Sequence, residues 1–195
     1  EKKITIEDMK YALSTHYQQT TLDPYASHGD LSMKGAYRPV GINRNDFLSI
    51  MQLRQGQEPI EWVAFASNVF NALIPFYTHI DQTPEYLNNT TKDVSTDNFY
   101  WSSRLIAAMA DASYKQSSIH IERYQRNVLS KGHHLLNVYD DLLSQEKDED
   151  KKLALRHEAN EKLAQMLKTE TADTLHLVLD ELSAIMKNKY ARSDA

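Results

Sequence analysis

The 195-residue sequence contains no cysteine. Disulfide bonds, thiolate metal sites and a cysteine nucleophile are therefore excluded within this chain. No apolar run approaches the length of about 18 residues that a membrane-spanning helix needs. Lysine and arginine number 22 against 27 acidic residues, which gives a formal net charge of −5. That balance argues against nucleic acid or an anionic membrane as a partner, because both recruit cationic surfaces.

Signature motifs of common enzyme classes are missing as well. There is no G-x-S-x-G nucleophile elbow, no phosphate-binding P-loop and no G-x-G-x-x-G dinucleotide fingerprint. His157 and Glu158 begin like the helical zinc motif, but Glu161 stands where the second histidine is required. His133 and His134 point about 100° apart on a helix and cannot share one metal ion. No metal or cofactor is expected, although the eight histidines leave a metal-dependent hydrolase as an alternative.

The sequence begins at Glu1 without an initiator methionine and without the apolar core of a signal peptide. This start predicts a processed product or a fragment of a longer protein.

What is present is typical of a folded globular protein, with 41% hydrophobic and 25% charged residues. Thr5 can cap an opening helix in which Met9, Ala12, Leu13 and His16 recur at helical spacing. A turn-rich segment follows over residues 18–41. Apolar, strand-forming runs then occupy residues 47–54, 60–66 and 72–77. Pro75 cannot donate to a ladder, so the third run is expected at a sheet edge, a bulge or a strand start.

The second half has helical periodicity. The pattern predicts helices from a cap at Thr96 or Asp97 to about Ser117, and over residues 121–142, 153–167 and 175–186. Gly132 weakens the second of these. We therefore predict an α+β protein with a few antiparallel strands and a helix-rich C-terminal region. Residues 1–96 hold the opening helix, the loop and the three-stranded part of a sheet, and residues 97–195 form the helical region.

Two groups of side chains are candidates for a site. Asn68 and Asn71 lie between two apolar strands, where their amides can donate to a substrate carbonyl as an oxyanion hole does. The alternative is a turn in which each asparagine caps its own backbone. Arg44 and Arg54 flank the first strand and can hold a substrate carboxylate, with surface salt bridges as the alternative. No complete active site follows from these residues alone.

Several segments carry a resemblance to a known family. Residues 37–44 (YRPVGINR), 47–54, 62–77 (ending in SNVFNALIPFY) and 94–101 (VSTDNFYW) resemble, in the same order, the C-terminal part of the dipeptidase A family of lactic-acid bacteria. These are cysteine-dependent dipeptidases among the N-terminal-nucleophile hydrolases. The similarity covers about residues 37–112 and, more weakly, the opening helix.

The resemblance implies part of an αββα hydrolase fold and a thiol mechanism. In that family a cysteine at the mature N-terminus attacks the dipeptide carbonyl, its own α-amine acts as base, and water hydrolyses the acyl thioester. This chain has no cysteine, and Glu1 has neither thiol nor hydroxyl, so the nucleophile maps to no residue here. Among the residues that are present, the resemblance strengthens Asn68 and Asn71 as substrate-binding candidates, with Arg54 behind them.

We therefore expect the C-terminal portion of a cytoplasmic dipeptidase that is inactive alone. Its partners are the dipeptide substrate and the N-terminal catalytic half of the same protein. Three strands cannot close a two-sheet sandwich, so apolar sheet surface should be exposed unless that half, or a second copy in a homo-oligomer, covers it. The alternative is a stand-alone, non-catalytic α+β interaction domain.

Overall fold

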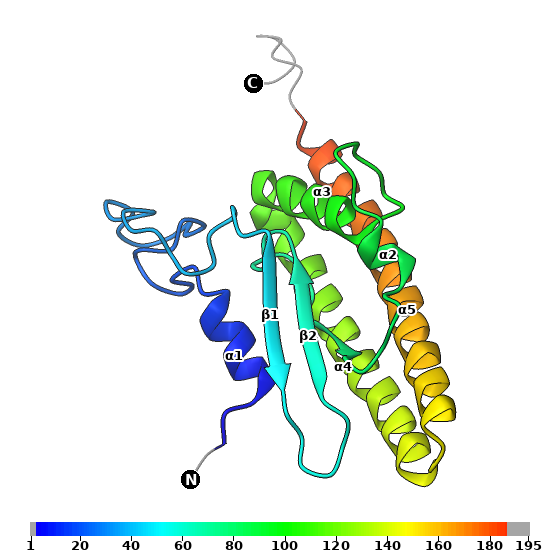
Figure 1. Cartoon of the computed structure of the whole chain (residues 1–195). Helices are drawn as coiled ribbons and strands as arrows, with labels where there is room; N and C mark the ends of the chain where they lie inside the picture. The colour runs from blue at the N-terminus through cyan, green and yellow to red at the C-terminus, as the bar shows by residue number, and fades with distance from the viewer. Residues whose placement is uncertain (1–2, 187–195) are drawn as a thin grey trace.

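A computed structural model describes residues 3–186 of the chain. Within that range the elements confirm the predicted α+β class, with a small antiparallel sheet followed by long helices (Figure 1). Their order is α1 (Ile6–Leu13), β1 (Phe47–Gln52), β2 (Ile60–Phe65), β3 (Ile74–Tyr77), α2 (Glu85–Asn88), α3 (Phe99–Ala112), α4 (Tyr114–Gln145) and α5 (Glu149–Ala184).

The sheet has the order β1-β2-β3, and both strand pairs are antiparallel. Phe47 pairs with Phe65 at one end of the sheet, and Gln52 pairs with Ile60 at the other. We call these the loop end and the hairpin end. Pro75 lies in β3, which is an edge strand, as its missing amide hydrogen predicted.

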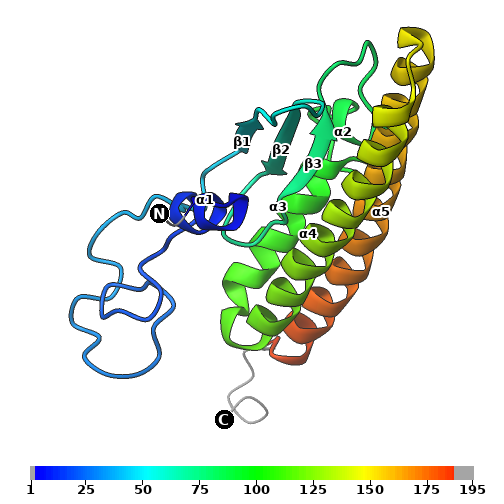
Figure 2. The ribbon, with the colours of Figure 1, turned by 90° about the horizontal axis from the view of Figure 1, so that it is seen from below.

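One face of the sheet packs against α4. Trp62 and Tyr77 point to this face, where Tyr139 of α4 joins the same apolar cluster. Gly132 of α4 lies so close to β3 that an added Cβ would sit 2.9 Å from the Pro75 ring. Figures 1 and 2 show α4 and α5 running side by side along the sheet. The glycine is therefore a point of close helix-to-sheet approach, and it does not break α4.

The opposite face is covered unevenly. Over β2 and β3, Val63 and Phe76 pack with Phe99 of α3 and belong to the larger apolar cluster. Over β1, Phe47 and Met51 are 55% and 58% exposed. The exposed apolar surface that a three-stranded sheet predicts therefore lies along β1.

The helices differ from the predictions in several places. The helix predicted to run to about Ser117 ends at Ala112, and α4 begins at Tyr114 instead of residue 121. Asn98 caps α3 by accepting from the Trp101 amide, instead of Thr96 or Asp97. The two helices predicted over 153–167 and 175–186 are one continuous helix, α5. Some of the polar residues between them face α4: Thr171 bonds the Tyr124 hydroxyl at 2.9 Å, and Glu170 accepts from Asn127 at 3.2 Å. Polarity at these positions reflects buried hydrogen bonds and was wrongly interpreted as a break.

The predicted division at residue 96 falls between α2 and α3. One apolar cluster nevertheless includes Val63 and Phe76 of the sheet together with Ile106, Val128 and Leu163 of the helices. The two regions therefore share a hydrophobic core. None of the helices within residues 3–186 combines the length and apolar character needed to cross a lipid bilayer.

Candidate functional site

The connection from β2 to β3 begins with a strained backbone. Ala66 is fully buried and has a φ of 59°, in the left-handed region that residues with a Cβ rarely occupy. Its amide donates to the Asp46 carbonyl at 2.8 Å, which fixes the start of the connection beside β1. Strain of this kind persists only where the surroundings impose it, and it gathers at functional sites.

Asn68 ties this connection to the segments that precede the sheet. Its Nδ2 donates to the carbonyl of Leu13 at 2.9 Å, and its Oδ1 accepts from Asn45 at 3.2 Å. Its own carbonyl accepts from the Lys10 ammonium. The Lys10 stem is partly exposed while its nitrogen is buried, and this burial lowers the pKa of Lys10 to about 7.

Asn71 is fully buried three residues later. Its Nδ2 donates to the carbonyls of Ser67 at 2.9 Å and Ser103 at 3.2 Å. The structure thus brings Asn68 and Asn71 together in one connection. Asn71 bonds a carbonyl of its own turn, whereas Asn68 bonds the distant Leu13 carbonyl, and neither side chain lines the cavities nearby.

Arg54 lies at the hairpin end, separated from the loop end and Asn68 by the length of the six-residue strand β2, roughly 20 Å at about 3.3 Å per strand residue. Its Nη2 donates to Asp140 Oδ1 at 2.9 Å and its Nε to the Glu58 carbonyl at 3.0 Å. The Arg54 and Asp140 side chains are only 13% and 8% exposed. The structure therefore does not bring Arg54 together with the two asparagines.

Three cavities surround the loop end, with volumes of about 680, 480 and 320 Å³. The largest lies between the segment preceding β1 and the α3–α4 junction, and Arg44 lines it. The second lies between α1 and α4, and the smallest lies between the β2–β3 connection and α4. Among the described residues, His16 is the one that lines all three.

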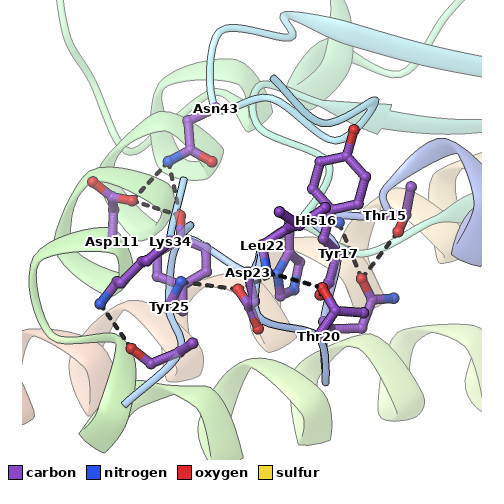
Figure 3. A network of polar contacts seen from close by, with 12 residues as sticks. Thr15, His16, Tyr17, Thr20, Leu22, Asp23, Tyr25, Lys34, Asn43 and Asp111 are labelled. Atoms are coloured by element: carbon purple, nitrogen blue, oxygen red, sulfur yellow. Dashed lines mark hydrogen bonds and ion pairs between the residues drawn. The ribbon is translucent and has the colours of Figure 1, made fainter. Parts of the chain in front are cut away.

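His16 is held firmly where the cavities meet (Figure 3). Its Nδ1 lies 3.0 Å from Asp23 Oδ1, and both side chains are 11% exposed. The ring packs edge-on against Tyr25 and Tyr114, with centroids 5.3 and 6.0 Å away. A carboxylate on one ring nitrogen fixes the orientation of an imidazole and the role of its other nitrogen.

Sequence reasoning missed this pair. His16 was assigned to the apolar stripe of the opening helix, but α1 ends at Leu13 and His16 lies in the turn that follows. Asp23 is seven residues further on, inside an irregular segment. No helical or strand periodicity relates the two positions, so the sequence offered no signal for the contact.

A second polar cluster fastens the segment before β1 to α3. The Tyr25 hydroxyl donates to Asp111 Oδ1 at 2.6 Å, and Asn43 Nδ2 donates to the same oxygen at 2.6 Å (Figure 3). Burial, and next the hydrogen bond to Asp111, raise the pKa of Tyr25. The walls of the largest cavity are therefore held by side-chain contacts as well as by backbone turns.

Metal chemistry finds no support in the described part of the chain. Within residues 3–186 no three histidine, aspartate or glutamate side chains gather closely enough to hold a metal ion. His157, which begins the incomplete zinc motif, instead lies 2.6 Å from Asp81.

Comparison with known proteins identifies the family. The model of peptidase family C69 matches residues 1–127, which include α1, the sheet, α3 and all residues that line the three cavities except Leu129. The chain belongs to peptidase family C69. This C69 chain is 38% identical over 197 residues to "Probable dipeptidase A" of Streptococcus pyogenes serotype M3 (strain SSI-1), an alignment that covers 99% of the chain and 41% of the relative.

Two further relatives of the C69 chain have similar names. "Dipeptidase" of Bifidobacterium longum (strain NCC 2705) is 45% identical over 148 residues, 74% of the chain and 28% of the relative. "Probable dipeptidase B" of Lactococcus lactis subsp. lactis (strain IL1403) is 32% identical over 197 residues, 99% of the chain and 41% of the relative. The resemblance seen in the sequence is thus confirmed, and the chain spans about two fifths of the streptococcal and lactococcal relatives.

Proposed function

We propose that this chain is the C-terminal portion of a dipeptidase whose cysteine nucleophile lies upstream of Glu1. The observation that carries the proposal is the alignment with relatives named dipeptidase, which runs through 99% of the chain but only 41% of the streptococcal relative. Because the chain has no cysteine, a thiol mechanism needs residues from outside it. The cytoplasmic location we propose rests on the family resemblance alone.

The proposed reaction has two steps. The thiolate sulfur bonds to the dipeptide carbonyl carbon, the C–N bond breaks, and the second amino acid leaves with a proton on its amine. Water then adds to the thioester carbonyl, the C–S bond breaks, the first amino acid is released and the thiol recovers its proton. This chain supplies walls of the substrate site at the loop end, while the thiol comes from the N-terminal half.

The exposed apolar residues of β1 support the proposal that a partner covers this strand. Phe47, Met51 and Leu53 are exposed, and the outer edge of β1 pairs with no strand in the described residues. Such an apolar edge is prone to association unless another segment covers it. We assign this surface to the N-terminal half of the same protein, and a second copy of the chain is the other occupant that a test must separate.

Sequencing the coding DNA upstream of Glu1 tests the proposal directly. We expect an open reading frame that runs back to an early cysteine codon. A start codon immediately before Glu1, with no cysteine upstream, would contradict it and would favour the stand-alone interaction domain.

Asn68 is proposed as a positioning residue of this site. Asn68→Ala removes the bonds to the Leu13 carbonyl and to Asn45, so the neighbouring Val69, which lines two cavities, loses its fixed position. In the full-length protein we expect dipeptide turnover to fall at least tenfold, which corresponds to about 1.4 kcal/mol in the barrier. Steady-state kinetics measures this, with the exposed Asn137→Ala as control. Unchanged turnover with unchanged folding would remove Asn68 from the site.

A further inference from the structure

The smallest cavity at the loop end has an unusual charge composition. It measures about 320 Å³, within the range of small-molecule sites. Asp23 and Glu122 line it together with His16, and no lysine or arginine does. Glu122 is exposed and has no ion-pair partner in the described residues. The field inside this cavity therefore favours a cation.

His16 offers an unused hydrogen-bonding atom to the same cavity. The residue is only 8% exposed, and its Nδ1 is engaged by Asp23. Within residues 3–186 its Nε2 has no hydrogen-bond partner. With the Nδ1 hydrogen donated to the carboxylate, a neutral ring presents the Nε2 lone pair as an acceptor. An acceptor that is fixed in orientation at the cavity wall and has no partner in the described residues is available to a ligand that donates.

The aromatic side chains that line the cavity also favour a cationic ligand. Phe70 and Tyr114 line the cavity, and aromatic faces attract cations. The pKa of the Tyr114 hydroxyl is raised, first by burial and then by the Asp23 and Glu122 carboxylates. Both carboxylates therefore act on the same point of the cavity wall, so their negative potentials add there.

The backbone around His16 is strained as well. Tyr17 and Gln19 have φ values of 64° and 65°, although neither is glycine. Gln18, between them, accepts the His16 amide through Oε1 at 3.0 Å. Such strain is maintained where a side chain must be held in one position, as at ligand-binding sites.

We propose that this cavity binds the ammonium group of the dipeptide, with the Glu122 carboxylate as counter-ion and His16 Nε2 as hydrogen-bond acceptor. The inference rests on the proposed dipeptidase function and deepens it by assigning one end of the substrate. A dipeptide carries an ammonium group at one end and a carboxylate at the other. A cavity lined by two carboxylates and an acceptor nitrogen fits only the ammonium end. Asp23 orients His16 and acts as a positioning residue.

The test uses the full-length protein and two ligands that differ by one group. Alanyl-alanine carries the ammonium, whereas propanoyl-alanine has the same shape without it. We expect Glu122→Gln to raise the KM for alanyl-alanine at least tenfold, with kcat within twofold and with the inhibition constant of propanoyl-alanine unchanged. Glu161→Gln, at an exposed position on α5 facing none of the three cavities, should alter none of these values.

Two results would overturn the assignment while leaving the dipeptidase proposal intact. One is an unchanged KM in Glu122→Gln, and the other is an equal weakening of both ligands, which would indicate a general structural effect. A full-length protein that does not hydrolyse alanyl-alanine at all would overturn the dipeptidase proposal and this assignment with it.

His16 has its own readout in nitrogen-15 NMR of the same protein. We expect Nδ1 to carry the ring hydrogen in the free state, and the Nε2 resonance to shift when alanyl-alanine, but not propanoyl-alanine, is added. The exposed His134 should not respond to either ligand. An Nε2 resonance that is insensitive to alanyl-alanine, or equally sensitive to both ligands, would remove His16 from the site.

Discussion

The two ends of the sheet use buried polar side chains in different ways. At the hairpin end, Arg54 pairs with Asp140, and Arg156 lies 3.2 Å from Glu58. At the loop end, the described residues contain no partner for His16 Nε2 or for the exposed Glu122 carboxylate, and Ala66 holds a strained conformation. Buried charges that satisfy one another leave no atom for a ligand, whereas a fixed group left without a partner is available to one.

This difference between the two ends changes which candidate residues can bind a ligand. Arg54 looked suited to a substrate carboxylate in the sequence, but its donors are taken by Asp140 and Glu58. His16 looked like one more position of a helix stripe, but it meets three cavities. Whether a side chain is free to bind a ligand therefore depends on its hydrogen-bond and ion-pair partners, which lie far away in the sequence.

The largest expected effect comes from breaking the Arg54–Asp140 ion pair at the hairpin end. Arg54→Ala leaves the Asp140 carboxylate buried without its counter-charge, and we expect a loss of about 3–5 kcal/mol in the free energy of unfolding. The double variant Arg54→Met with Asp140→Leu should lose less, because no charge is left unpaired. Urea unfolding measures both. A loss well below 1 kcal/mol, combined with a raised KM for dipeptides, would instead return Arg54 to the substrate site.

The second prediction concerns pH and the buried Lys10 amine. Its pKa is lowered to about 7 in the fold, against 10.5 for the free side chain, so between these values only the unfolded chain holds the proton. Stability should then rise with pH above 7, by at most about 1.4 kcal/mol per pH unit. Lys10→Met should flatten this rise and the exposed Lys115→Met should not. Parallel profiles for Lys10→Met and the unmodified chain would contradict the burial of this amine.

The smallest expected effect tests how tightly the loop end is packed. A Cβ on Gly41 would lie 2.3 Å from the Ser14 carbonyl oxygen, so Gly41→Ala must push the two backbones apart. We expect a loss of about 1–3 kcal/mol, typical of overpacking, in thermal or urea unfolding. Val40→Ala, at the exposed neighbouring position, should cost little. Equal stabilities of the two variants would show that this contact is loose.

Local chemistry made much of the fold predictable. The Thr5 cap, the strands around the turn at residues 53–59 and the edge position of Pro75 follow from patterns within a few residues. The continuity of α5 did not, because Thr171 is polar yet faces a buried hydroxyl of α4. Prediction from periodicity fails where a polar side chain finds its partner on another element.

The site was predictable only in part. The sequence located the β2–β3 connection through Asn68 and Asn71, and the structure places that connection beside two of the three cavities. It did not reveal Lys10, His16 or Glu122. These residues belong to α1, an irregular turn and α4, and only the fold brings them to one end of the sheet.

The central claim is that this chain forms the loop-end walls of a thiol dipeptidase whose nucleophile lies upstream. The most direct measurement is alanyl-alanine hydrolysis by the chain alone and by the full-length protein, each with and without an alkylating reagent. We expect no hydrolysis by the chain, and full-length activity that alkylation abolishes. Hydrolysis by the chain alone, or full-length activity that survives complete thiol alkylation, would contradict it.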